Sequence, residues 1–213
     1  MEDLVVVTPD GAYPLVLEEF LKRAASLGVR SVSRRIIMDP LRDSSGELPD
    51  LLRPFLGISR KALAIRDLEG SGWEKHGAVA LEEHLVKRMH RNAWASSDCA
   101  AIVVPPEIEA WLRLPSTHLD ELITERARRH REWTAARRRE VLDGIVSNFG
   151  GCDDSGKPRR PKEVFEEFLR RLGIPRSNAL YQRLAQKESL TSCVTPSFLR
   201  LRDLLRNWFP IEP

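Results

Sequence analysis

Short apolar runs alternate with amphipathic stretches along the first half of the chain. The runs are rich in Val, Ile and Ala, as buried parallel strands are. They predict strands at residues 4–8, 29–38, 61–66 and 99–104. Apolar positions near helical spacing predict the intervening helices at 13–27, 48–56 and 79–89. This alternation predicts parallel strands that are joined by right-handed helical crossovers.

The pattern changes after Pro106, beyond which no apolar run predicts a strand. Helical spacing predicts helices at residues 108–114, 118–148, 162–172, 179–187 and 197–209. A stretch rich in Gly, Asp and Pro at 150–160 predicts a linker. The expected fold class is therefore α/β, with a four-stranded parallel sheet in a domain at 1–115 and a helical C-terminal region at 116–213.

Composition places the chain among folded proteins, because 42% of its 213 residues are hydrophobic and 31% are charged. No stretch approaches the roughly 20 apolar residues that cross a bilayer. Glu2 and Asp3 precede an apolar run that is too short for a signal peptide. We therefore expect a cytoplasmic protein with no membrane partner. Its oligomeric state does not follow from the sequence.

The three cysteines, Cys99, Cys152 and Cys193, stand far apart and form no CxxC pair. This spacing argues against a structural zinc site and against a disulfide framework. We expect Cys99 to be buried in a strand and Cys152 to lie in a linker.

Acidic residues follow three of the predicted strands. Ligands bind at the carboxyl ends of strands in open parallel sheets, so these residues are expected near one edge. They are Asp10 after the first strand, Asp67, Glu69 and Glu74 after the third, and Glu107 and Glu109 after the fourth. Such crowding costs energy unless a cation or basic groups neutralise it. Mg²⁺ or Mn²⁺ suits these oxygen ligands, although each carboxylate alone also fits a solvated loop.

A second candidate surface is basic. Arg137, Arg138 and Arg139 close a segment with seven arginines that begins at Arg126. The segment is compatible with two structures. One is a surface that contacts the phosphate backbone of a nucleic acid. The other is a solvated helix laced with ion pairs to interspersed Glu residues.

Two segments carry a resemblance to a known family. Residues 64–74, AIRDLEGSGWE, resemble the strand and DxD segment of TOPRIM-type domains, with Glu69 in place of the second Asp. Residues 103–112, VVPPEIEAWL, resemble the ExEAW signature of an uncharacterised TOPRIM-related family of bacterial defence islands. Pro161-Lys162, Tyr181 and Pro196-Ser197-Phe198 are similar to that family's usual ending. Within the family, the chain resembles a small component of methylation-associated anti-phage defence systems.

The resemblance implies a divalent-metal-dependent nuclease, or nuclease-like subunit, of an anti-phage defence system that acts on nucleic acid. It implies that Asp67 and Glu69 hold Mg²⁺ and that Glu109, with Glu107 or Glu74, completes or orients the site. Asp67, Glu69 and Glu109 are then expected to converge at one end of the sheet. Other protein subunits of such a system are further expected partners.

One position departs from the TOPRIM pattern. The first TOPRIM strand usually ends in a Glu that acts as general acid or base, and Thr8 stands at that position here. Thr cannot ionise, so Asp10, two residues on, is the candidate substitute for proton transfer. The departure favours an alternative function as a non-catalytic protein-binding or sensor subunit of the same kind of system. A third alternative is an enzyme that acts on a small phosphorylated molecule.

Overall fold

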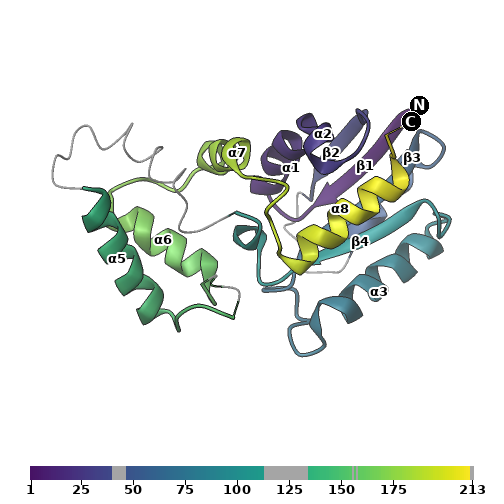
Figure 1. Cartoon of the computed structure of the whole chain (residues 1–213). Helices are drawn as coiled ribbons and strands as arrows, with labels where there is room; N and C mark the ends of the chain where they lie inside the picture. Colours follow the sequence, from purple (N-terminus) through teal and green to yellow (C-terminus); the bar gives the residue numbers. More distant parts are fainter. Residues whose placement is uncertain (40–46, 113–133, 155, 157, 212–213) are drawn as a thin grey trace. The chain divides into compact units, whose positions relative to one another are not determined.

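The computed structural model describes residues 1–39, 47–112, 134–154, 156 and 158–211 (Figure 1). Two compact units are present. Unit 1 comprises Met1–Ile108 and Ser189–Pro213, and unit 2 comprises Glu109–Glu188. The predicted division at residues 115 and 116 assigns the last helix to the helical region, whereas the structure packs that helix in unit 1.

Unit 1 contains a sheet of four parallel strands, as the sequence predicts. The strands are β1 (Glu2–Thr8), β2 (Arg34–Met38), β3 (Ser59–Asp67) and β4 (Cys99–Val104). Their order in the sheet is β2-β1-β3-β4, and every neighbouring pair is parallel. The two central strands, β1 and β3, carry the buried apolar runs Leu4–Val7 and Ala62–Ile65, as strands do when helices cover both faces of a sheet.

One face of the sheet packs on α3 (Gly77–Arg91) and the 3₁₀ helix η1 (Leu48–Phe55). Val5 and Val7 of β1 face Leu81 and Leu85 of α3 in one apolar cluster. Alternate residues along the strands point the other way, toward a second helical layer. The sheet is therefore the middle of three layers, which leaves its amino and carboxyl edges as places for polar side chains.

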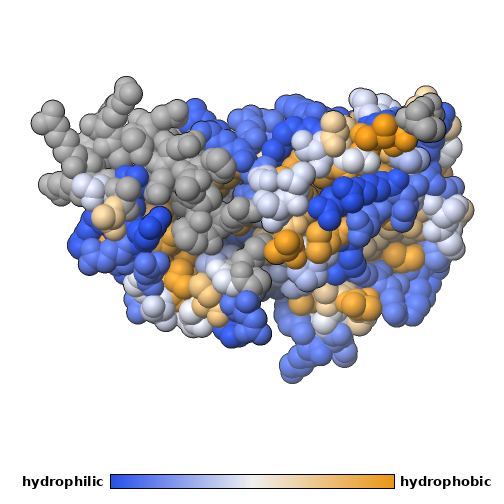
Figure 2. Space-filling model, viewed as in Figure 1, coloured by the Kyte–Doolittle hydropathy of each residue, from blue (hydrophilic) through white to orange (hydrophobic). Residues whose placement is uncertain are grey.

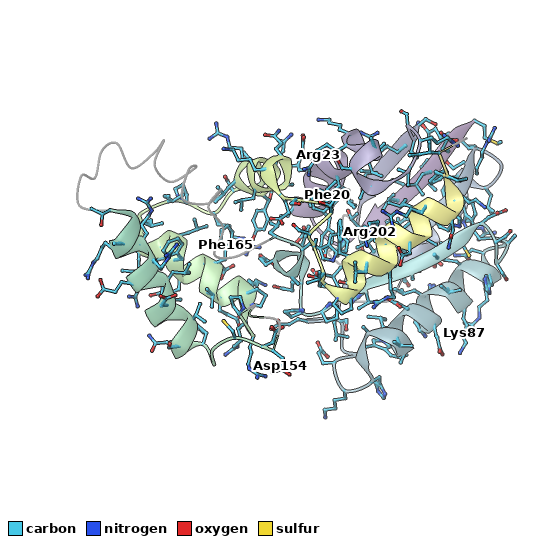
Figure 3. The ribbon with its side chains drawn as sticks, in the orientation of Figure 1. Phe20, Arg23, Lys87, Asp154, Phe165 and Arg202 are labelled. Carbon is cyan, nitrogen blue, oxygen red and sulfur yellow. The ribbon has the colours of Figure 1, made fainter. Side chains whose placement is uncertain are left out.

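The second layer consists of α1 (Ala12–Lys22), α2 (Ala24–Leu27) and α8 (Pro196–Trp208). Phe20 of α1 and Phe198 of α8 meet edge to face, with ring centroids 5.5 Å apart (Figure 3). Both rings are buried. The C-terminal helix thus completes the core of unit 1, although it is far from the sheet in sequence.

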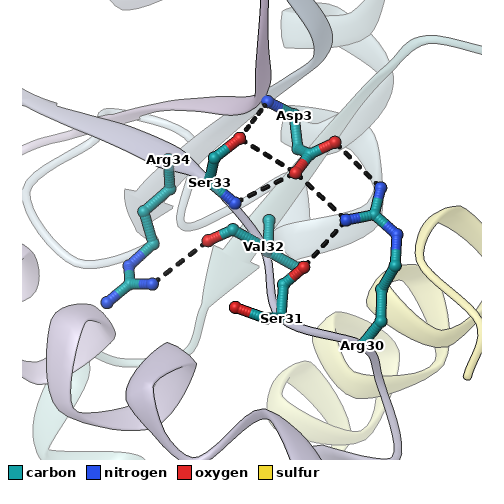
Figure 4. A network of polar contacts seen from close by, with 6 residues as sticks. All are labelled: Asp3, Arg30, Ser31, Val32, Ser33 and Arg34. Carbon is teal, nitrogen blue, oxygen red and sulfur yellow. Dashed lines mark hydrogen bonds and ion pairs between the residues drawn. The ribbon is translucent and has the colours of Figure 1, made fainter.

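A polar network joins β1 to the segment before β2 at the amino edge of the sheet (Figure 4). The Asp3 carboxylate accepts two hydrogen bonds from Arg30, at 2.8 and 3.0 Å, and others from the amide and hydroxyl of Ser33. The Arg30 guanidinium holds the pKa of the Asp3 carboxyl well below its ordinary value, and the Ser33 amide and hydroxyl lower it further. β2 starts at Arg34, directly after Ser33 of this network, rather than at residue 29 as predicted.

Unit 2 is helical in its described residues, and the predicted helices recur there with small shifts. It contains α5 (Ala135–Asn148), α6 (Pro161–Arg171) and α7 (Asn178–Lys187). The 3₁₀ helix η2 (Ile108–Ala110) bridges the boundary between the units in sequence. Residues 118–133 of the predicted helix at 118–148, and residues 113–114 of the predicted helix at 108–114, lie outside the described residues. In the predicted linker, Cys152 and Pro158 form an isolated antiparallel bridge.

The predicted positions of Cys99 and Cys152 agree with the structure. Cys99 is buried in β4, Cys152 is exposed in the segment between α5 and α6, and all three cysteines are free thiols. Burial raises the pKa of the Cys99 thiol to about 11, and the nearby Asp98 adds to the effect. This thiol is therefore protonated at neutral pH.

The visible face of unit 1 is mainly hydrophilic, with small hydrophobic spots (Figure 2). Large apolar side chains that are exposed among the described residues are Met1, Met38, Ile58, Val79, Val194 and Ile211. They come from different parts of the chain, and scattered apolar residues of this kind are ordinary on folded proteins. None of the described helices is long and apolar enough to cross a membrane.

Candidate functional site

The carboxyl edge of the sheet gathers the ends of β1, β2 and β3. Register places Thr8 of β1 beside Met38 of β2, and the backbone amide of Asp39 donates to the Thr8 carbonyl at 2.8 Å. Asp67 ends β3 beside Val104 of β4. Because all four strands are parallel, these residues share one edge, where the sequence predicted the site.

Asp67 is held in place by a tyrosine from α1. The buried hydroxyl of Tyr13 donates to Oδ1 of Asp67, which is half-buried. A charge-assisted hydrogen bond of this kind fixes the rotamer of the acid. Sequence reasoning did not find Tyr13, because nothing in the chain links it to a residue 54 positions away.

Asp10 binds the backbone at the start of α1. Its Oδ1 accepts hydrogen bonds from the backbone amides of Ala12, at 2.8 Å, and Tyr13, at 3.4 Å. The carboxylate therefore satisfies amide groups in the first turn of the helix, as a capping residue does. Its predicted role as a substitute proton carrier stays a prediction. Thr8 is fully buried and donates its hydroxyl proton to the carbonyl of Ile37 at 3.1 Å.

Arg66 is a buried cation at this edge that the sequence reasoning missed. Its side chain is only 5% exposed, and burial lowers its pKa, whereas the charges of Asp67, Asp39 and Glu74 raise it. Asp39 is itself 5% exposed. Arg66 therefore neutralises part of the negative charge of the carboxylates that gather at this edge. An Arg directly before Asp67, at the end of an apolar strand, was the signal available in the sequence.

Glu69 and Glu74 lie in the loop between β3 and α3. Glu69 has an exposed side chain, and its backbone amide donates to the carbonyl of Pro106 at 3.1 Å. Glu74 is exposed too, and its Oε1 accepts from the amide of Gly72 at 3.3 Å. The pKa of the Glu74 carboxyl is lowered, first by its own backbone amide and then by other amides of the loop.

Glu109 lies in unit 2, where it is 1% exposed. Its Oε1 accepts hydrogen bonds from the hydroxyl of Tyr181 and from Nη2 of Arg176, the latter at 3.4 Å. Burial raises the pKa of the Tyr181 hydroxyl, and the Glu109 charge raises it further. Phe165 packs edge to face on Tyr181, with ring centroids 5.5 Å apart (Figure 3). Glu109 therefore organises the interior of unit 2.

The structure thus places Asp67, Glu69 and Glu74 on one edge of unit 1. Glu107 is half-buried in the turn after β4 in the same unit. The convergence of Glu109 with Asp67 stays a prediction, since the two residues belong to different units. Among the described residues, no three His, Cys, Asp or Glu side chains form a group that could hold a metal ion.

The predicted nucleic-acid contacts lie on α5 of unit 2. Arg137 and Arg139 are exposed, and Arg137 pairs with Glu140 at 2.9 Å. Arg138 is 7% exposed. Two of the three arginines therefore offer their guanidinium groups to a partner in this conformation. The earlier arginines of the segment, from Arg126 to Arg131, lie outside the described residues.

Comparison with protein-family models, with curated proteins and with solved structures gave no match to this chain. The resemblance to a TOPRIM-related family therefore stays a prediction, and the function is argued from the site itself.

Proposed function

We propose that this protein is a divalent-metal-dependent, TOPRIM-like nuclease or nuclease-like subunit of an anti-phage defence system, acting on nucleic acid. The observation that carries the proposal is the position of Asp67. It ends a central strand of a parallel sheet, at the edge where such sheets bind ligands, with its carboxylate oriented by Tyr13. Glu69 and Glu74 follow it in an exposed loop.

The donor types suit a hard cation, although the three carboxylates do not meet as a metal-holding group in this conformation. Carboxylate oxygens of Asp67, Glu69 and Glu74 are the ligands that Mg²⁺ and Mn²⁺ prefer. Bound there, such an ion would supply charge stabilisation at a phosphate and a more acidic water molecule. The neighbouring Arg66 opposes cation binding, because its positive charge lies within electrostatic range of Asp67 and Glu74. We therefore expect weak binding that strengthens when a phosphate group is present.

A metal titration tests the proposal. Adding Mn²⁺ or Mg²⁺ to the full chain should raise its thermal stability, by about 2.7 kcal/mol at a hundredfold excess over Kd. The double variant Asp67→Asn with Glu69→Gln should lose this response. It should also lose any metal-dependent cleavage of DNA or RNA. Glu83→Gln is a matched control, because Glu83 is an exposed acid of α3 that pairs with Lys87. A parent protein that does not respond to either metal contradicts the proposal.

The alternative function, a non-catalytic subunit that binds partner proteins, is favoured by two observations. Thr8 is buried and bonded to the carbonyl of Ile37. Arg66 already neutralises part of the carboxylate charge that a metal would otherwise neutralise. On this alternative, neither metal changes stability and the arginine surface of α5 binds no nucleic acid, so the titration above separates the two functions.

A further inference from the structure

The two edge strands of the sheet in unit 1 differ in how their outer backbone groups are satisfied. On β4, the amide of Val103 donates to Oε1 of Glu82 at 2.8 Å, and Nη2 of Arg200 donates to the Val103 carbonyl at 3.4 Å. Glu82 of α3 and Arg200 of α8 also form an ion pair at 2.6 Å. Side chains from both helical layers therefore close this edge, and a closed edge does not pair with a further strand.

The outer edge of β2 is open. The amide of Asp39, directly after the strand, donates to the carbonyl of Thr8 in β1 at 2.8 Å. Backbone groups alternate in direction along a parallel strand, so the odd-numbered residues of β2 face β1 and the even-numbered residues face outward. The outward amides and carbonyls are those of Arg34, Ile36 and Met38. Within the described part of the chain, no backbone or side-chain group pairs with them.

Both arginines of β2 point toward the amino end of the strand. Nη2 of Arg34 pairs with Glu18 of α1 at 2.6 Å, and its Nη1 donates to the carbonyl of Val32, two residues back (Figure 4). Arg35 pairs at 2.8 Å with Glu2, which lies at the start of β1. The positive charges of this edge are therefore neutralised in part within the chain, and the second half of the strand is apolar.

This pattern is complementary to itself. When two copies of β2 lie antiparallel about a two-fold axis at Ile36, the outward groups of Ile36 meet their own equivalents, and those of Arg34 meet those of Met38. Every outward amide and carbonyl then has a partner. No arginine stands opposite an arginine, because the arginines diverge on either side of the axis. Met38, which is 44% exposed, is covered by the aliphatic part of Arg34 from the second copy.

We infer that the outer edge of β2 is a dimerisation surface, on which β2 of a second copy pairs antiparallel with Ile36 at the two-fold axis. The two four-stranded sheets then form one continuous sheet. Assembly stops at two copies, because the contact uses the same edge of both and the edge of β4 is closed by Glu82 and Arg200. The inference depends neither on the proposed metal nor on the proposed nuclease function.

Sedimentation equilibrium of the full chain, from micromolar to millimolar concentration, tests the inference. The parent should pass from monomer to dimer over this range. Ile36→Pro should weaken the dimer at least about tenfold, because proline lacks the N–H that pairs at the axis. The amide of Ile36 faces outward, so the variant keeps the hydrogen bonds between β1 and β2. Circular dichroism and urea unfolding of the variant confirm that its monomer is folded.

Charge variants of Met38 test the register. Met38→Glu places a carboxylate opposite Arg34 of the second copy, twice in each dimer, and should strengthen association about fivefold. Met38→Lys should weaken association by a similar factor, because it places two positive charges opposite each other. Val79→Glu and Val79→Lys are matched controls, since Val79 is an exposed apolar residue of α3, which packs beside the opposite edge strand, β4. Both control variants should associate as the parent does.

Hydrogen exchange distinguishes a second copy from other occupants of the edge. The amides of Arg34, Ile36 and Met38 should exchange more slowly as the protein concentration rises. Three outcomes overturn the inference. Slow exchange at every concentration would mean that another segment of this chain covers the edge. A parent that stays monomeric would leave the edge to a different protein. A dimer that is unchanged in Ile36→Pro and in both Met38 variants would use another surface.

Discussion

The hydroxyl of Tyr13, in the first turn of α1, donates to Oδ1 of Asp67 at the end of β3. The bond joins a helix and a strand that are 54 residues apart, directly at the edge where the carboxylates gather. It gives the candidate metal ligand a fixed orientation in the free protein, and it ties the site to the core of unit 1.

Replacing Tyr13 with Phe should destabilise unit 1. The substitution removes the donor but keeps the buried ring, so the loss is that of one hydrogen bond to a charged group, about 1.5–3 kcal/mol. Urea unfolding at pH 7 measures it. The double variant with Asp67→Asn should lose less than the sum of the two single losses, because both remove the same bond. Additive losses would show that the two side chains do not interact.

Replacing Glu109 with Gln should destabilise the protein whether or not metal is present. Glu109 is 1% exposed and accepts from Tyr181 and Arg176, so the variant weakens a buried network, by about 1–3 kcal/mol. Unfolding curves in EDTA and in Mn²⁺ measure the effect. Tyr181→Phe is the partner variant for a double-mutant cycle. A Glu109→Gln protein that keeps the parent's stability but loses its response to Mn²⁺ would instead make Glu109 a metal ligand.

Nucleic-acid binding, where it occurs, should depend on the exposed arginines of α5. Replacing Arg137 and Arg139 with Ala should weaken binding and reduce the salt slope by about 1.8 units on a log–log plot, if each residue contacts one phosphate of duplex DNA. Arg138 is kept, because it is 7% exposed and its loss would disturb the unit. Fluorescence anisotropy at several salt concentrations gives the slope.

Glu140→Gln is the control for this experiment, because it removes the ion-pair partner of Arg137 without removing an arginine. It should leave the salt slope of the parent unchanged. An Arg137/Arg139 variant that binds DNA and RNA with the parent's slope would identify these residues as a solvated helix face. That result would favour the non-catalytic, protein-binding function over the nuclease.

The Asp3 network should make the free energy of unfolding depend on pH in the acidic range. Because folding lowers the pKa of Asp3, the stabilisation is fully present above the unfolded value of about 4 and is lost as pH falls toward the folded value. Asp3→Asn should therefore destabilise the protein by about 1–3 kcal/mol at pH 7 and by progressively less below pH 4. Urea unfolding of the variant and the parent between about pH 2.5 and pH 7 measures how this difference in stability changes with pH. A constant difference between variant and parent over that range would contradict the assignment.

Local patterns in the sequence were sufficient to locate the four strands of unit 1, although not every element boundary. β4 occupies residues 99–104 as predicted, because an apolar run bounded by Pro105 and Pro106 has few alternatives. The position of Asp67 at the carboxyl edge also followed, since its strand and the parallel topology were both readable from periodicity. The predicted helix at 13–27 divides at Arg23 into α1 and α2, a local break that periodicity did not show.

Only the tertiary structure decided which side chains meet. Tyr13 reaches Asp67 across 54 residues, and Tyr181 reaches Glu109 across 72. Phe198 brings α8 back to unit 1, where it packs on Phe20. Periodicity reports which face of an element is apolar, and that depends on residues within a few positions of one another. Partners of buried charges such as Arg66 and Glu109 are chosen by the packing of distant elements, which no local pattern contains.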